Sequence, residues 1–319
     1  MQYRTLGSTG LSVSPICFGT SRFAREVDGT IQTTRDEAHA LLDRCLEHGI
    51  NFFDCANIYG TPSGTAERWL GEWLTGVDRE EVVVASKVRW RMGDGPNRAG
   101  LSRKHVKAQL RASLERLGTD YVDLYYIHGW DNETPIRETM RAMDDLVREG
   151  LVHHLGASNT AAWQLVSALW ESDVDGLERF SVTQPRFNAA YREAPAPLLD
   201  ACADQGLAVC PYAGLAGGFL TGKYDRDTPP PPGSRADVYG WEDRFEARQW
   251  RVLDAVRDVA AESGATPAQV ALRWLLEREA FTCVPIVAAR THEQLDENAG
   301  AVDVSLSKAQ RERITAAYG

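Results

Sequence analysis

The chain of 319 residues lacks the patterns that mark exported, membrane-spanning or disulfide-linked proteins. No stretch approaches the roughly 20 consecutive apolar residues that a transmembrane helix needs. The N-terminus, MQYRTLGSTG, has no basic segment followed by an apolar one. The six cysteines form no CxxC pair, so they are expected to be reduced, buried thiols. The sequence therefore predicts a cytoplasmic protein with no membrane segment.

Basic segments and metal-binding patterns are also scarce. The formal net charge is -10 and no block of lysine or arginine occurs, so no nucleic-acid partner is predicted. The adjacent residues His153 and His154 would face opposite sides of a strand and could not hold one ion, and no metal site is predicted. The partner that remains is a small-molecule substrate, and association with further copies of the chain is left open.

What the chain does have is a regular alternation of short apolar runs with amphipathic stretches. The runs are nearly continuous in apolar residues, as is typical of parallel strands covered on both faces. The stretches between them begin at capping boxes such as TRDE (34–37) and TPAQ (266–269). The eight expected strands are ICFGT (16–20), INFFD (50–54), VVVASK (82–87), VDLYYIH (122–128), HHLGAS (153–158), FSVTQ (180–184), LAVCP (207–211) and CVPIV (283–287).

This alternation favours an α/β fold of the (β/α)8 barrel type over an open sheet. Eight strand–helix units fit the length of the chain, and no run is followed by the GxGxxG fingerprint of dinucleotide-binding open sheets. We expect a single barrel domain over residues 1–319, with an N-terminal β-hairpin and extra C-terminal helices. Residues 222–250 include four consecutive prolines and predict a long active-site loop that leads into an extra helix.

Polar residues stand at the ends of several predicted strands, where the loops of a barrel converge on one mouth. Asp54, Lys87 and His128 end three successive strands, and Tyr59 lies on the loop after Asp54. A lysine ammonium close to a phenol would lower the pKa of the tyrosine, and a carboxylate would keep that lysine charged. This pattern predicts Tyr59 as a proton donor, Lys87 as its activator, Asp54 as the partner of the lysine and His128 as a group that orients a substrate oxygen.

Together these motifs resemble those of the aldo-keto reductases over essentially the whole chain. The resemblance rests on FFDCANIYG, VVVASK, DLYYIH, GASN, TQPRFN, LAGGFLTGKY and ARTHEQLDENAG, all in the family's order. It implies a TIM-barrel oxidoreductase that reduces an aldehyde or ketone with NADPH, and it matches Asp54, Tyr59, Lys87 and His128 to the family's catalytic tetrad. The branch that it resembles includes bacterial aldehyde and sugar-ketone reductases and potassium-channel β subunits.

The resemblance also implies where the nicotinamide end of NADPH or NADP+ would bind. Ser158, Asn159 and Gln184 match residues that contact the carboxamide, and Tyr212 matches the aromatic residue that stacks on the ring. The Ser-Pro pair that commonly follows this aromatic residue is replaced here by Ala-Gly.

The remaining cofactor contacts are assigned in the same way. The backbone of Leu215 or Gly217 is expected to serve the pyrophosphate. Arg290, Gln294 and Asn298 match the adenosine end, with Arg290 on the 2′-phosphate, which favours NADPH over NADH. Gln294 has an alternative interpretation, since it also completes a capping box.

Aromatic residues near the strand ends suggest a substrate pocket. Trp90 and Trp130 follow the strands of Lys87 and His128, and Phe23 follows the first strand; all three are predicted to line the pocket, with packing under the loops as the alternative. Four tryptophans within helical stretches are instead expected to pack inside the protein, at positions 163, 170, 250 and 274.

Two other functions stay open at this point. A Schiff-base aldolase would use Lys87 as its nucleophile, but it would leave Arg290 and Tyr212 without a role. An NADPH-binding redox sensor or regulatory subunit would keep the cofactor residues and turn over little substrate. The complete tetrad favours turnover.

Overall fold

Eight parallel strands form one curled sheet in the computed structural model, which describes residues 1–193, 195–239 and 245–319. The strand order is β11-β10-β9-β8-β7-β6-β3-β12. The bounds are β3 Cys17–Gly19, β6 Phe52–Asp54, β7 Val83–Val88, β8 Val122–Ile127, β9 Val152–Ser158, β10 Phe180–Gln184, β11 Ala208–Val209 and β12 Ile286–Val287.

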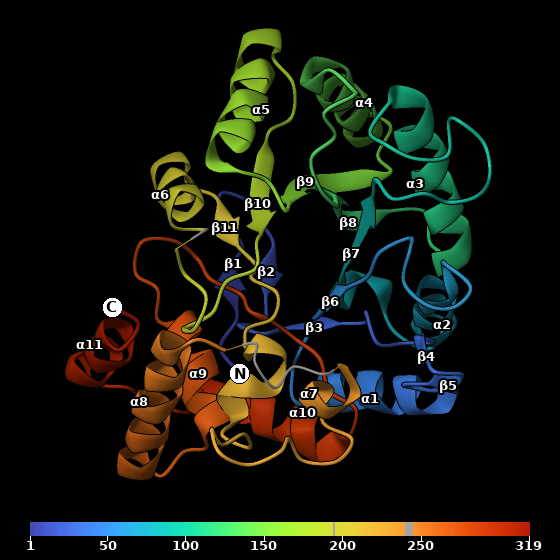
Figure 1. Cartoon of the computed structure of the whole chain (residues 1–319). Helices are drawn as coiled ribbons and strands as arrows, with labels where there is room; N and C mark the ends of the chain where they lie inside the picture. The colour runs from blue at the N-terminus through green and yellow to red at the C-terminus, as the bar shows by residue number, and fades with distance from the viewer. Residues whose placement is uncertain (194, 240–244) are drawn as a thin grey trace.

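Backbone hydrogen bonds close this sheet on itself. The amide of Val209 in β11 donates to the carbonyl of Thr282 over 2.8 Å, and the amide of Val284 donates back to the carbonyl of Val209 over 2.9 Å. Since both partners lie just before β12, the two outer strands of the sheet order are joined. The predicted (β/α)8 barrel is confirmed (Figure 1).

Helices surround the barrel (Figure 1). The predicted capping boxes at Thr34 and Thr266 do begin helices. The helices that accompany the strands are α1 Arg35–Glu47, α2 Thr65–Leu74, α3 Arg103–Leu117, α4 Ile136–Arg148, α5 Ala162–Asp175, α6 Ala196–Gln205, α9 Pro267–Leu276 and α10 His292–Ala299. Two extra helices, α8 Ala247–Ser263 and α11 Lys308–Ala316, pack together beside α9, as the prediction of extra C-terminal helices requires.

An N-terminal hairpin covers one end of the barrel. It consists of β1 Arg4–Thr5 and β2 Ser12–Val13, paired antiparallel. Leu6 and Val13 are fully buried and belong to the same apolar cluster as the residues that point into the barrel, so the predicted hairpin acts as a plug. A second hairpin, β4 Glu26–Val27 with β5 Thr30–Ile31, follows β3 and was not predicted.

The two-residue period of the strands decides which side chains reach the barrel interior. On β7, Val83 and Ala85 belong to the interior cluster, whereas Val84 packs outward in the cluster that includes the helices. The same period directs Lys87 inward at the carboxyl end of the strand. On β6, one strand away, it directs Asp54 inward.

A tyrosine ring fills the barrel beneath these two charged groups. Tyr126 is fully buried, and its ring lies against Gly156 of β9 so closely that a Cβ at that glycine would come within 2.4 Å of the ring. The Nζ atom of Lys87 is 5.9 Å from the centroid of the Tyr126 ring. The glycine therefore makes room for an aromatic floor under the mouth.

The segment 222–250 forms part of the mouth. It follows a 3-10 segment, Ala216–Thr221, and includes the short helix α7 Arg235–Tyr239 and the start of α8. No helix or strand covers the four prolines, as predicted. Residues 240–244 of this segment lie outside the described residues. None of the helices in the described ranges is long and apolar enough to cross a bilayer.

The helical tryptophans do not all behave as predicted. Trp274 is fully buried and Trp250 packs partly buried against the cluster around α8. Trp163 and Trp170 are instead exposed on α5, so the prediction that they pack inside the protein is wrong.

Candidate active site

A buried lysine organises the mouth of the barrel. The Nζ atom of Lys87 lies 2.6 Å from Oδ2 of Asp54, 2.8 Å from the carbonyl oxygen of Cys55 and 3.3 Å from the hydroxyl of Tyr59. The lysine side chain is fully buried, so these three oxygens take the place of water around the ammonium. The contact with Cys55 was not predicted, because a backbone carbonyl leaves no signal in the residue types.

Burial and the nearby charges set the protonation states of this cluster. Burial by itself would lower the pKa of Lys87, but the Asp54 carboxylate and the Tyr59 hydroxyl outweigh it and raise that pKa above its usual value. The ammonium therefore stays charged. Burial raises the pKa of Tyr59 to about 12, although the charge of Lys87 lowers it. The predicted net lowering is thus wrong: the effect of the lysine is present, but burial outweighs it and Tyr59 keeps its proton at neutral pH.

His128 lies beside the phenol as a neutral ring. Its centroid is 5.8 Å from that of Tyr59, in an edge arrangement. Burial, together with the charges of Lys87 and Arg89, lowers the pKa of His128 to about 3. Its Nδ1 atom is buried and has no hydrogen-bond partner among the described residues, so packing holds the ring. A neutral imidazole in this position can orient a carbonyl oxygen without adding charge.

A second chain of hydrogen bonds connects the predicted nicotinamide residues to Asp54. Nε2 of Gln184 donates to Oδ1 of Asp54 over 2.9 Å, so both carboxylate oxygens are held. Oγ of Ser158 donates to the backbone carbonyl of Gln184, Nδ2 of Asn159 donates to Oγ of Ser158, and the hydroxyl of Tyr212 donates to Oδ1 of Asn159, each over 2.9 Å. The two-residue period of β6 and β10 could have indicated that Asp54 and Gln184 both face the barrel interior.

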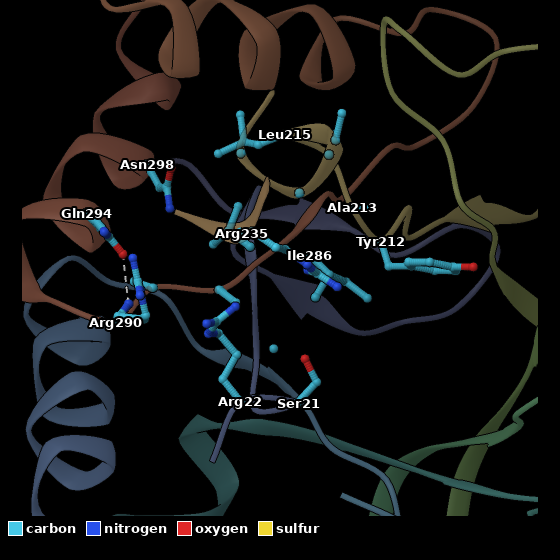
Figure 2. Close-up of a pocket in the computed structure, with 18 of the residues that line it drawn as sticks. Ser21, Arg22, Tyr212, Ala213, Leu215, Arg235, Ile286, Arg290, Gln294 and Asn298 are labelled. Atoms are coloured by element: carbon cyan, nitrogen blue, oxygen red, sulfur yellow. Dashed lines mark hydrogen bonds between the residues drawn. The ribbon is translucent and has the colours of Figure 1, made fainter. Parts of the chain in front are cut away.

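One cavity of about 800 Å³ opens at this mouth. Figure 2 shows Arg290, Gln294 and Asn298 at one end of it and Tyr212 at the other, with Arg22 between them. The structure brings together in its lining all the residues predicted to bind the cofactor, namely Ser158, Asn159, Gln184, Tyr212, Leu215, Gly217, Arg290, Gln294 and Asn298. Asp54, Tyr59 and His128 line the same cavity.

The lining of the cavity carries more positive than negative charge, although the whole chain has a formal net charge of -10. Among the described residues of that lining, the acidic ones are Asp54, which is paired with Lys87, and Glu297. A cavity of this kind attracts an anionic ligand. Arg290 was predicted from the sequence. The other basic residues of the lining, which come from separate loops, were not: Arg22, Arg25, Arg186, Lys223 and Arg235.

Two of the residues predicted to contact the cofactor have distinctive local geometry. The backbone amide of Arg290 donates to Oε1 of Gln294 over 2.9 Å, and the backbone amide of Gln294 donates to Oγ1 of Thr291 over 3.3 Å. Gln294 therefore caps α10 and lines the cavity at once. The chain turns sharply at Gly217 and Gly218, with φ of 72° and 98°, a conformation that brings bare backbone to the cavity wall.

None of the three residues predicted to form the substrate pocket lines this cavity. Phe23 is buried in the core against Phe18, with ring centroids 6.0 Å apart, which corresponds to the alternative of packing under the loops. Trp90 is exposed and lies edge-on to His128 at 6.2 Å, at the border of the site. Trp130 packs against Trp163 at 6.0 Å. Neither tryptophan is part of the cavity lining.

Known proteins match this chain over nearly its whole length. The model of the aldo/keto reductase family matches residues 15–318. An uncharacterized oxidoreductase, YrpG of Bacillus subtilis, is 37% identical over 97% of this chain and 93% of its own length. A probable voltage-gated potassium channel subunit beta of Arabidopsis thaliana is 35% identical, covering 95% and 92%. Norsolorinic acid reductase B of Dothistroma septosporum is 34% identical, covering 100% and 82%.

Removing one partner of the buried ion pair should destabilise the fold. We expect Asp54→Ala to lower the free energy of unfolding by roughly 3–5 kcal/mol, because it leaves the Lys87 ammonium buried without its carboxylate. Urea denaturation measures this change. The double variant Asp54→Ala/Lys87→Met, which removes the stranded charge, should recover part of the loss. Asp200→Ala, at an exposed site on α6, is the control. Equal stability of Asp54→Ala and wild type would contradict the role of the pair.

Proposed function

The chain belongs to the aldo/keto reductase family, a family of oxidoreductases, and on this premise we propose that it reduces an aldehyde or ketone to an alcohol with NADPH. One observation carries the proposal. The phenol of Tyr59 lies 3.3 Å from the buried, charged Lys87 at the wall of a cationic cavity. This arrangement supplies a proton donor beside a site suited to an anionic cofactor.

The residues of the cavity fit NADPH. A volume of about 800 Å³ is that of a pocket for a large ligand, and the basic lining suits the pyrophosphate and the 2′-phosphate. In this proposal Arg290 holds the 2′-phosphate, and the turn at Gly217 presents backbone to the pyrophosphate. Tyr212 and Asn159 hold the nicotinamide end. When bound, the reduced nicotinamide supplies the hydride.

The chain's own residues supply the rest of the chemistry. His128, neutral in this site, would donate a hydrogen bond to the substrate oxygen and fix its position. As the carbonyl carbon is reduced, negative charge develops on that oxygen, and Tyr59 gives it the proton. The phenolate that remains is stabilised by the Lys87 ammonium. Asp54 acts through the lysine, which it keeps charged and oriented.

A regulatory function is the second candidate, and the aldolase alternative loses support. A relative at 35% identity carries the name of a probable potassium channel subunit, which is compatible with a regulatory subunit that binds NADPH and turns over little substrate. A Schiff-base nucleophile must be a neutral, accessible amine, whereas Lys87 is fully buried and held by Asp54. The aldolase is therefore not proposed.

Removal of the phenolic hydroxyl should separate catalysis from binding. We expect Tyr59→Phe to lower kcat for carbonyl reduction by about 10²- to 10⁴-fold, because the general acid is lost, while the Kd for NADPH stays near that of the wild type. NADPH oxidation and fluorescence titration measure the two effects. Tyr3→Phe, at an exposed site near the N-terminus, should change neither. A wild-type kcat in Tyr59→Phe would refute the proton-donor role.

The pH dependence should be flat over a wide range. The protonated phenol is the donor, so a pKa of Tyr59 raised to about 12 extends activity to high pH, and a His128 pKa lowered to about 3 removes a histidine titration near neutrality. We expect kcat/KM, which reports the free enzyme, to stay constant from about pH 5 to about pH 10. An apparent pKa between about 6 and 9 for the reduction would contradict these protonation states.

The basic end of the cavity should distinguish the two nicotinamide cofactors. Arg290→Ala is expected to raise the Kd for NADPH by about 10- to 100-fold, because a charge-assisted contact to the 2′-phosphate is lost. The Kd for NADH should change little. Titration of both cofactors into wild type, Arg290→Ala and the surface control Arg111→Ala measures this. Equal weakening of NADPH and NADH would remove the assignment.

A further inference from the structure

Helix α5 carries a row of apolar side chains on its outer face. Trp163, Val166, Trp170 and Val174 expose 64%, 44%, 60% and 59% of their surface. Their spacing of three and four residues places all four on one face, here called the α5 stripe. The opposite face of the helix, which includes Leu165, is buried against the barrel. Helix α5 is therefore apolar on its outer face as well as on its buried face.

The stripe exposes more apolar area than apolar residues that are scattered singly over a protein surface. At about 250 Å² for a whole tryptophan, the two indoles alone expose on the order of 300 Å², which already reaches the size of the largest apolar patch on a typical monomer. The valines add to it. A standard interface buries about 800 Å² on each partner around an apolar centre, and tryptophan is among the residues enriched at such centres. The stripe has the size and composition of such a centre.

We propose that the α5 stripe is the centre of a two-fold interface with a second copy of this chain. The order large, small, large, small along the stripe is self-complementary. If two copies of α5 pack antiparallel about an axis between Val166 and Trp170, Trp163 lies opposite Val174 of the second copy, and Val166 lies opposite its Trp170. Each indole then meets a smaller side chain, as close packing requires, and the contact is isologous.

The acidic residues near the C-terminal end of α5 are paired within the chain and do not decide the orientation. Glu171 and Asp175 form ion pairs with Arg137, Asp175 also pairs with Arg141, and Asp173 pairs with Arg179. The antiparallel orientation is therefore inferred from the order of the side chains along the stripe.

The position of the stripe is compatible with an open site. In Figure 1, α5 lies across the barrel from α7 and α10, and residues of α7 and α10 line the cavity. A second copy on α5 therefore leaves that side of the mouth free. The stripe begins near the mouth, where Trp163 contacts Trp130.

Solution mass tests the proposal on the full chain. At about 50 µM, sedimentation equilibrium of the wild type should give twice the chain mass of 35.3 kDa. Trp170→Arg should weaken association at least about tenfold without changing the Kd for NADPH, which shows that the variant is folded. Leu46→Glu replaces an exposed apolar residue of α1 and should remain dimeric. A monomeric wild type, or a Trp170→Arg variant that dimerises normally, would overturn the proposal.

Cross-linking tests the orientation independently. All six native cysteines are buried and unpaired, so the wild type should form no intermolecular disulfide under mild oxidation. The double variant Trp163→Cys/Val174→Cys should form a covalent dimer, because the two positions oppose each other across the axis. Val174→Cys alone should not, since its two copies would lie about 16 Å apart along the helices. Cross-linking of the single variant with none in the double would overturn the antiparallel arrangement.

Discussion

A fully buried ammonium is the constraint on which the mouth of this barrel depends. Moving a lysine charge out of water costs several kcal/mol unless oxygens replace the solvent. Here Asp54, the carbonyl of Cys55 and the hydroxyl of Tyr59 surround Lys87, and Gln184 holds the second oxygen of Asp54. The pair therefore ties the ends of β6, β7 and β10 together. The same ammonium stands where a phenolate would need it, so stability and chemistry rest on one contact.

Sequence periodicity predicts this cluster well because the strands are regular. Alternation along β6 and β7 decides that Asp54 and Lys87 face the interior, and the end of each strand decides that they lie at the mouth. The protonation of Tyr59 could not be predicted in the same way. Its pKa depends on burial by distant parts of the chain as well as on Lys87, and burial decides the sign. The residue types alone indicate the charge of Lys87, but they do not indicate how far the Tyr59 phenol is removed from water.

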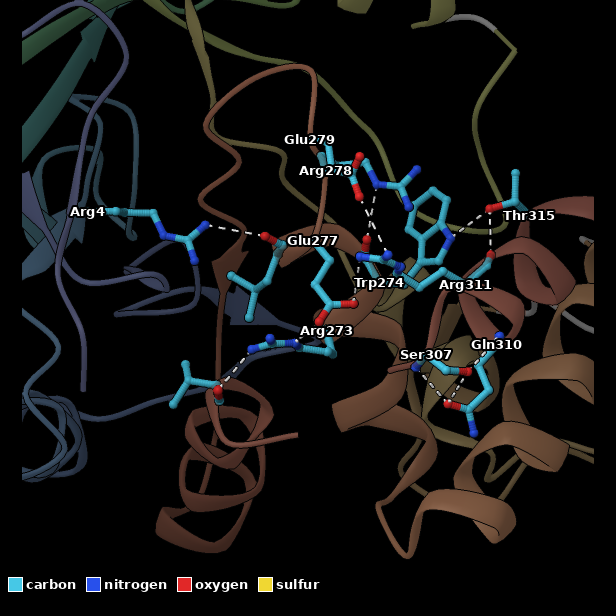
Figure 3. A network of polar contacts seen from close by, with 12 residues as sticks. Arg4, Arg273, Trp274, Glu277, Arg278, Glu279, Ser307, Gln310, Arg311 and Thr315 are labelled. Atoms are coloured by element: carbon cyan, nitrogen blue, oxygen red, sulfur yellow. Dashed lines mark hydrogen bonds and ion pairs between the residues drawn. The ribbon is translucent and has the colours of Figure 1, made fainter. Parts of the chain in front are cut away.

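For the C-terminal helices, too, the sequence predicts local features and does not predict contacts between distant residues. The helix starts at Thr266 and Ser307 follow from capping boxes in the sequence. Their packing also depends on a contact that no local pattern indicates. Glu277, after α9, accepts a local i,i+4 hydrogen bond from Arg273 over 2.8 Å and a second one from Arg311 of α11 over 3.4 Å (Figure 3). An arginine of the N-terminal hairpin, at position 4, donates to the carbonyl of Cys283 over 3.0 Å.

Quantities averaged over the whole sequence, such as net charge, do not reveal the basic cavity or the α5 stripe. The net charge of -10 gives no sign that arginines from separate loops, such as Arg22 and Arg290, line one cavity, because composition does not record which loops converge. On α5 the difficulty is the reverse. A helix that is apolar on both faces offers no polar face to mark the solvent side, so Trp170 is read as a core residue although the barrel buries only the opposite face. The exposed face then needs its own physical explanation, and burial against a second α5 supplies one.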